Sequence, residues 1–296
     1  MDAVLPLKLY GDWNDHDLTR ARILCFSLRR FWAGEAPLCL HVIARDAERG
    51  TVEQGLAEFA GGRLAIEVVA ETALVPTLAE VPGASGWYRQ QVIKLAAHRL
   101  VAGWAYLTLD ADVVCIRRID ESTLLPDGRI LTDWERRVLH ADWWEASASL
   151  LGVLPGLDGV GLKPTPAILS TAICQRLESW LDGIGGWAGL LVRTGWTEYT
   201  LYNLFADRHG LTAVFHAGET DERRGLLRAH YSFSSRAEFE QWKPERAMAP
   251  DGRGCFIVCN SSARVDPAEI WARLGPCFGD EVSFPALDGR RFLEGE

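Results

Sequence analysis

The sequence predicts an α/β protein, with a mostly parallel sheet covered by helices in a single domain that spans residues 1–296. From residue 1 to about residue 130, apolar strand-like runs alternate with segments of helical periodicity. The strand-like runs are apolar almost throughout, which is typical of parallel sheets buried on both faces. Hydrophobic residues make up 48% and charged residues 24%, so a disordered or low-complexity chain is excluded.

Each element of the first half follows from its local pattern. Apolar runs predict strands over residues 5–10, 38–44, 64–69, 104–116 and 129–132. Apolar residues at helical spacing predict helices over residues 19–31, 51–59 and 88–101. In the first of these helices, Ile23, Leu24 and Leu28 recur on one face. The fourth strand is interrupted only by two aspartates.

The second half is less regular. Helices are expected over residues 142–151, 164–181, 197–209 and 267–274, and strands over residues 211–216 and 255–259. A Gly-rich loop at 154–163 and a Gly/Trp turn at 183–189 connect them. Thr197 or Gly195 suits a helix cap, and so does Asp266. Because no linker or internal repeat appears, one continuous domain is expected.

Charge and cysteine usage limit the functional classes. The chain has 31 Lys+Arg against 40 Asp+Glu, a net charge of −9, so binding to nucleic acid is not expected, although a local basic pocket for one small phosphate ligand is compatible. Seven cysteines without a CxxC pair indicate free thiols in a reducing compartment, so a cytoplasmic location is expected. No transmembrane segment is expected, because no apolar run approaches 18 residues, whereas 12 Trp leave peripheral membrane contact open.

The sharpest motif is the segment LTLDADVV, in which Asp110 and Asp112 end an apolar strand. On an extended strand, side chains at i and i+2 lie on the same side, ~6–7 Å apart. Two like charges buried this close cost several kcal/mol unless a cation neutralises them. Mg²⁺ or Mn²⁺ with oxygen ligands would do so and would also bind a diphosphate. A solvated strand end or turn is the alternative.

LTLDADVV, together with WYRQQVIKL before it and WTEYTLY after it, resembles the DXD region of GT-A-fold glycosyltransferases. The resemblance is clearest over residues 85–205, and the pattern is also similar to a bacterial family of uncharacterised glycosyltransferase-like proteins. It implies metal-assisted transfer of a sugar from a nucleoside diphosphate sugar to an unknown glycan or lipid-linked acceptor, in a pathway such as polysaccharide synthesis. Residues 1–135 would then be the donor half and residues 136–296 the acceptor half.

The resemblance also assigns binding roles to particular residues. Asp110 would lie near the donor ribose and the metal, and Asp112 would be the direct metal ligand. Gln91 and Lys94 would reach donor hydroxyls or phosphates, although a lysine there also suits a surface position with its stem packed on the core. After the first strand, Tyr10 could stack on the base and Asp12 could accept a hydrogen bond from it. Alternatively Asp12 forms a turn and Asp17 caps a helix.

Catalytic and further metal candidates come from the second half. Glu198 would be the general base of an inverting enzyme or would support the sugar cation in a retaining one. The helix dipole alone also favours a carboxylate there, and Asp133 is the competing candidate. A third metal ligand is sought among His216, His230 and Asn260, each of which also suits a structural role. Asn260 in CFIVCNSS replaces the histidine expected in related retaining enzymes, which puts strict metal dependence in question.

Two other functions stay open. A nucleotidyltransferase acting on a sugar phosphate would use similar acids, but YGDWNDHD lacks the Gly-rich basic loop that such enzymes carry after the first strand. A non-catalytic sugar- or nucleotide-binding protein on the same scaffold is the third candidate. The segment KPTP at residues 163–166 either lines the acceptor cleft through Thr165 or forms a rigid start to the helix that follows.

Overall fold

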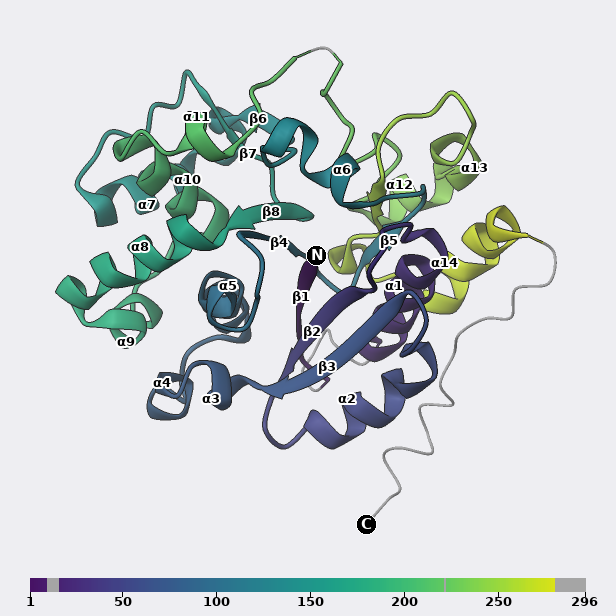
Figure 1. The fold of residues 1–296 in the computed structure, drawn as a ribbon, viewed down its shortest axis with the longest axis horizontal. Helices are drawn as coiled ribbons and strands as arrows, with labels where there is room; N and C mark the ends of the chain where they lie inside the picture. Colours follow the sequence, from purple (N-terminus) through teal and green to yellow (C-terminus); the bar gives the residue numbers. More distant parts are fainter. Residues whose placement is uncertain (10–15, 221, 280–296) are drawn as a thin grey trace.

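The computed structural model describes residues 1–9, 16–220 and 222–279, and these form a mixed α/β domain around one five-stranded sheet (Figure 1). The strand order is β3-β2-β1-β4-β8. The four strands β1 to β4 are parallel, and β8 pairs antiparallel with β4 at one edge. The bounds are β1 Asp2–Leu7, β2 Leu38–Ala44, β3 Leu64–Ala70, β4 Ala105–Thr108 and β8 Ala167–Ser170. The predicted α/β class and mostly parallel sheet are confirmed.

Helices cover both faces of this sheet, which explains why its strands are mostly apolar. Alternate residues of β1 face opposite sides, so Ala3 and Leu5 pack against one group of helices and Val4 against another. The first group is α1 (Asp17–Phe31) and α2 (Arg49–Leu56). The second is α5 (Gly86–Ala96), α7 (Ala141–Leu151), α8 (Thr171–Leu181), α9 (Gly186–Leu191) and α10 (Glu198–Arg208) (Figure 1).

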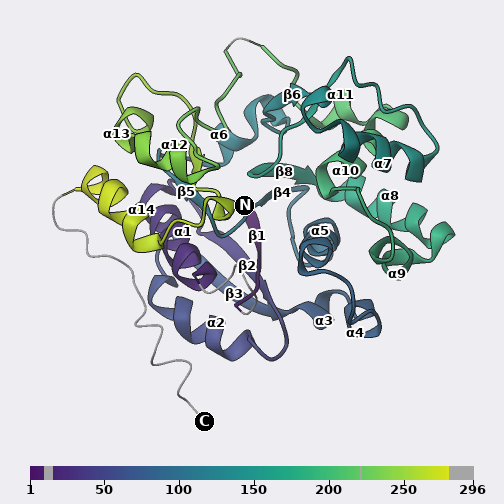
Figure 2. The same ribbon diagram turned by 180° about the vertical axis from the view of Figure 1, so that it is seen from behind.

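A smaller layer lies beyond α1. Strand β5 (Val113–Cys115) pairs antiparallel with β9 (Phe256–Val258), and the two enclose a third core cluster with α12 (Arg236–Gln241) and α14 (Pro267–Leu274) (Figure 2). A second ribbon joins β6 (Trp134–Arg136) to β7 (Val160–Leu162). The remaining short helices are α3 (Glu71–Leu74), α4 (Thr77–Glu80), α6 (Glu121–Leu124), α11 (Thr212–Phe215) and α13 (Pro244–Ala247).

The predicted strand over residues 104–116 is broken in two. Strand β4 ends at Thr108, between β1 and β8, and β5 begins at Val113 with β9 as its partner. Between them the backbone turns, and the Val113 N–H donates to the Asp110 carbonyl over 3.1 Å. Asp110 and Asp112 therefore lie on a turn between two sheets and not on an extended strand.

Three other expectations were wrong. The helix predicted over residues 164–181 is β8 followed by α8, because two prolines favour an extended chain before the apolar run at 167–170, which pairs with β4. Residues 211–216 contain helix α11 instead of a strand. Residues 129–132 form only an isolated bridge, from Ile130 to His216. These runs are too short for their apolar pattern to separate strand from helix.

Other local expectations are confirmed. Residues 38–44 are β2, and residues 267–274 are α14, whose N-cap Asp266 accepts a hydrogen bond from the Ala268 N–H over 2.7 Å. Thr197 caps α10 through a capping box with Thr200. All seven cysteines are free thiols. Within the described ranges, none of the helices has the length and apolar character needed to cross a bilayer.

Candidate active site

A cleft opens at the carboxyl ends of β1 and β4. Chain order reverses between these neighbouring strands, because β2 and β3 follow on one side of β1 and β4 on the other. Such a switch point is where open α/β sheets bind ligands. Lys8 follows β1, Asp110 follows β4, and both line a cavity of about 460 Å³. Its other lining residues are Pro6, Asp17, Gly86, Trp87, Gln90, Ala111, Asp112, Thr165, Val258, Asn260 and Ser261.

Asp112 is held firmly and left partly unsatisfied. Its Oδ2 accepts from the Ser261 N–H over 2.8 Å, and its backbone carbonyl accepts from the Cys259 N–H over 2.8 Å. Its Oδ1 is buried and has no hydrogen-bond partner within the described residues. Burial, and secondly repulsion from Asp110, raise the pKa of Asp112 to about 6. The carboxylate therefore keeps one buried oxygen that is able to accept a hydrogen bond or contact a cation.

A third carboxylate in the cleft, Asp17, was expected only as a helix cap. It is the first residue of α1 and makes an ion pair with Arg20 over 3.0 Å. Burial raises its pKa to about 6 despite Arg20, and the charges of Asp110 and Asp112 add to the effect. No short motif marks this residue. Asp17 reaches the cleft because α1 packs beside the turn that carries Asp110 and Asp112.

Lys94 lies at the centre of a buried charge cluster. It is only 4% exposed, and its Nζ lies 2.7 Å from Asp110 Oδ1 and 2.9 Å from Glu198 Oε1. Burial lowers the pKa of Lys94, but the two carboxylates outweigh this and raise it well above its usual value. Lys94 therefore links the end of β4 to the start of α10.

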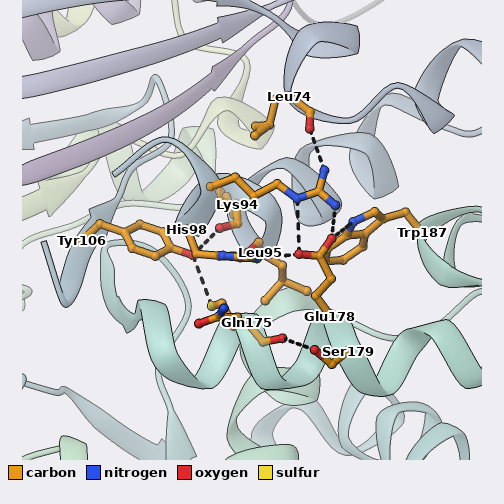
Figure 3. Close-up of polar contacts among 11 residues, drawn as sticks. Leu74, Lys94, Leu95, His98, Tyr106, Gln175, Glu178, Ser179 and Trp187 are labelled. Carbon is orange, nitrogen blue, oxygen red and sulfur yellow. Dashed lines mark hydrogen bonds and ion pairs between the residues drawn. The ribbon is translucent and has the colours of Figure 1, made fainter. Parts of the chain in front are cut away.

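The backbone of α5 is fixed at the same point. The Tyr106 hydroxyl of β4 donates to the Lys94 carbonyl over 2.7 Å and contacts the Cys174 sulfur at 3.2 Å (Figure 3). One turn further on, Glu178 of α8 accepts hydrogen bonds from His98, Arg99 and Trp187 (Figure 3). These contacts anchor the end of α5 to the sheet and to α8, so the position of Lys94 is set from two sides.

Glu198 and Gln91 belong to the same arrangement. The Gln91 side-chain oxygen accepts from the Glu198 N–H over 2.8 Å at the start of α10. Glu198 is 2% exposed, and burial raises its pKa against the opposing charge of Lys94. Both residues, with Lys94, line a second cavity of about 110 Å³. Asp110, Trp87, Gln90 and Thr165 line both cavities, so the two form one continuous cleft.

The remaining predicted residues fall into four groups. Asn260 lines the large cavity, and its Oδ1 accepts from the Ser262 N–H over 2.9 Å. Asp133 and His230 line a different cavity of about 160 Å³. His216 is buried away from the cleft, between the hydroxyls of Thr132 and Tyr202. Tyr10 and Asp12 lie outside the described residues.

Lys8 and the Trp87 ring line the cleft but were not predicted from the sequence. Trp87 is 43% exposed and packs near Trp143 at a centroid distance of 6.2 Å, so the cleft has an aromatic wall. Thr165 lines the cleft, as one of the two interpretations of the segment KPTP predicted. Its buried Oγ1 has no hydrogen-bond partner within the described residues. A lysine just after a strand and a tryptophan at the start of a helix are the signals that could have found them.

A different cluster of side chains that could bind a metal ion lies at the opposite end of the sheet. Asp2, Cys39 and His41 are the one group of three such side chains, within the ranges described, whose donor atoms lie within 4.8 Å of one another. The His41 ring lies 3.1 Å from Asp2 and 3.0 Å from Glu67, so two carboxylates bracket it. In the cleft the chain brings fewer ligands together, so a cation bound there would complete its shell from substrate and water.

Comparison with known proteins gives a family and a fold. The sequence profile described as "Family of unknown function (DUF6492)" matches residues 1–281. No curated protein matches the chain. Mouse xyloside xylosyltransferase 1 in its apo form is similar over 90% of this chain and 100% of its own, with 14% identity and a TM-score of 0.53.

Two further solved structures are similar to a lesser degree. The bifunctional glycosyltransferase WbbM matches 88% of this chain and 45% of its own, with 12% identity and a TM-score of 0.49. The galactosyltransferase LgtC in complex with donor and acceptor sugar analogues matches 69% and 70%, with 15% identity and a TM-score of 0.40. At such identities the likeness concerns the fold, which is that of GT-A glycosyltransferases.

Proposed function

The chain belongs to the family DUF6492, whose function is unknown, and we propose that it is a glycosyltransferase. It would transfer a sugar from a nucleoside diphosphate sugar to a glycan or lipid-linked acceptor, assisted by Mn²⁺ or Mg²⁺. The observation that carries the proposal is the pair Asp110 and Asp112 at the switch point of the sheet, facing a cavity of about 460 Å³. The buried, unpartnered Oδ1 of Asp112 indicates a cationic ligand.

The residues present fit a hard divalent ion. Asp110 and Asp112 offer carboxylate oxygens, and Asn260 adds an amide beside them. When bound, such an ion would neutralise these acids and the charge that develops on the departing nucleoside diphosphate. Since Lys94 already neutralises one oxygen of Asp110, Asp112 would be the principal ligand.

Other residues of the cleft would hold and orient the donor. Lys8 would place a cation beside the phosphates, and Trp87 would offer a flat face for a sugar or base. The unpartnered Thr165 hydroxyl suits a sugar hydroxyl. Asp110 would also face the donor ribose, and Gln91 and Lys94 would border the sugar. Tyr10 and Asp12 remain proposed contacts of the base.

Glu198 is the proposed acceptor-side carboxylate. Lys94, 2.9 Å away, stabilises its charged form and so opposes the effect of burial, which raises the pKa of Glu198. In an inverting reaction it would take the proton of the acceptor hydroxyl, and in a retaining one it would support the developing sugar cation. Asp133, in the neighbouring cavity, is the alternative base.

Thermal shift measurements with UDP, GDP, CDP and CMP, each with and without Mn²⁺, test the proposal. A transferase should be stabilised by one nucleoside diphosphate only when Mn²⁺ is present. Asp112→Asn should abolish that joint effect, while the exposed control Asp251→Asn keeps it. Stabilisation by a free sugar alone would favour a binding protein, and stabilisation by a nucleoside triphosphate with a sugar phosphate would favour a nucleotidyltransferase. Mn²⁺-dependent binding that survives in Asp112→Asn would refute the metal role.

A further inference from the structure

Another polar cavity, separate from the two that form the cleft, lies beside it, and we call this cavity the basic pocket. It has a volume of about 160 Å³ and is lined by four cationic side chains, those of Lys163, Arg223, Arg224 and Arg228. Two carboxylates, Asp133 and Glu219, line it as well. An excess of positive charge in one cavity stands out in a chain with a net charge of −9.

Two of these cations, Lys163 and Arg228, are attracted by Asp133 and Glu135 but form no ion pair with them. Arg223 pairs with Asp127 over 2.9 Å, and Arg224 pairs with Glu219 over 3.0 Å. Neither Lys163 nor Arg228 forms an ion pair within the ranges that the structure describes, although both are half-buried. The side-chain hydrogen bonds of Arg228, to Ser232 at 3.4 Å and the Thr165 carbonyl at 3.5 Å, are long.

The electrostatics agree with this geometry. Burial and the neighbouring Arg228 charge lower the pKa of Lys163 more than Asp133 and Glu135 raise it. Burial likewise lowers the pKa of Arg228. Two cations that are partly withdrawn from water and face one another are stabilised when an anion binds between them.

The basic pocket adjoins the cleft through a single stretch of chain. Lys163 lines the basic pocket, Pro164 lines the smaller cavity of the cleft, and Thr165 lines both cavities of the cleft. Arg228 reaches this wall from the pocket side and is attracted to Asp112 beyond it. A molecule whose hydroxyl reacts in the cleft could therefore place another of its groups in the basic pocket.

We infer that the basic pocket binds an oxyanion, a phosphate or a carboxylate, carried by the acceptor. This inference rests on the proposed glycosyltransferase function. Lys163 and Arg228 would hold the anion by charge-assisted hydrogen bonds. The buried Oδ1 of Asp133, which lacks a partner within the described residues, would accept a hydrogen bond from a neighbouring hydroxyl of the same molecule. A neutral sugar would leave both cations without a partner, so the pocket selects against it.

Isothermal titration calorimetry with three probes tests the inference: glucose 6-phosphate, glucuronate and glucose. The wild-type protein should bind at least one of the charged sugars about tenfold more tightly than glucose, because a hydrogen bond to a charged group contributes at least that factor. Tighter binding of the phosphate or of the carboxylate identifies the anion. Lys163→Gln and Arg228→Gln should each lose about tenfold in this affinity, whereas Lys163→Arg should keep it.

The exposed substitutions Lys243→Gln and Arg176→Gln are the matched controls and should bind like wild type. Lys163→Gln should also melt no lower than wild type, because it removes a half-buried cation that forms no ion pair within the described residues. Equal affinity for charged and neutral sugars, or unchanged affinity in both pocket variants, would overturn the inference. So would loss of Mn²⁺-dependent UDP binding in these variants, which would assign both cations to the donor. Anion binding that persists in a protein without nucleotide binding would reject the transferase function alone.

Discussion

Replacing Lys94 with methionine isolates the buried charge cluster of the cleft. Methionine keeps most of the volume of the lysine stem but removes the ammonium group that lies within 3 Å of both Asp110 and Glu198. Glu198 is 2% exposed, so water cannot replace the lost cation. Removing one partner of a buried pair costs about 3–5 kcal/mol, which corresponds to a fall in melting temperature of roughly 5–8 °C for a domain of this size.

The deficit should depend on pH. Burial already raises the pKa of Glu198, and Lys94 opposes that rise, so the pKa climbs further in Lys94→Met. A carboxyl whose pKa is higher in the folded than in the unfolded state loses stability as pH rises through the folded value. Urea unfolding should therefore show a larger loss at pH 8 than at pH 5.

A double variant provides the decisive comparison. Lys94→Met with Glu198→Gln removes the second charge as well, so it should recover at least half of the lost stability. Lys243→Met, at an exposed position, should change stability by less than about 0.5 kcal/mol. A loss below about 1 kcal/mol in Lys94→Met, or a double variant that is no more stable than the single one, would show that this cluster is solvated and not a buried unit.

Three other perturbations have defined outcomes. Burial lowers the pKa of His216 to about 3, so the stability that the neutral imidazole contributes is complete above the unfolded pKa near 6.5 and falls by up to about 1.4 kcal/mol per pH unit below it. The raised pKa values of Asp17 and Asp112 act in the opposite direction, so the contribution of His216 is the difference between wild type and His216→Asn in urea unfolding, which should grow with pH up to about 6.5. A Cβ on Gly161 would lie 2.1 Å from the Trp144 ring, so Gly161→Ala should cost about 1–3 kcal/mol in thermal unfolding. Gly50→Ala, which meets no atom within 4 Å in helix α2, should instead be neutral or stabilising. Tyr106→Phe leaves the α5 carbonyl without its donor and should cost about 1–3 kcal/mol by the same measurement.

The first half of the fold could be predicted because its local signals are long and consistent. Residues 38–44 form β2 with the expected bounds, and the helix expected over 19–31 begins only two residues earlier. The second half mixes short runs whose partners lie far away in sequence. Residues 167–170 become a strand because β4 offers an open edge, and no local pattern contains that information.

The site shows the same division. The sequence predicts Asp110 and Asp112 at the edge of the sheet where ligands bind, because two acids follow an apolar strand, and both line the cavity. Asp17 joins them only through the packing of α1, which a single sequence does not encode as a motif. Lys94 and Glu198 were each expected near substrate, but their direct ion pair depends on the meeting of α5 and α10, 104 residues apart.

The cleft has an unpartnered carboxylate oxygen, whereas the basic pocket has cations without an ion pair within the described residues. This difference has a consequence for substrate recognition. The cleft gathers Asp17, Asp110 and Asp112, and Arg20 and Lys94 pair with the first two. The buried Oδ1 of Asp112 still has no partner within the described residues, so a diphosphate beside it would be repelled unless a cation in addition to Lys8 accompanied it. The basic pocket, beyond Thr165, needs no such help, because its own cations face an anion directly. Donor binding should therefore require a divalent ion, whereas binding of an anionic acceptor should not. Chelation would then separate the two steps in a single protein, with the donor lost and the acceptor retained.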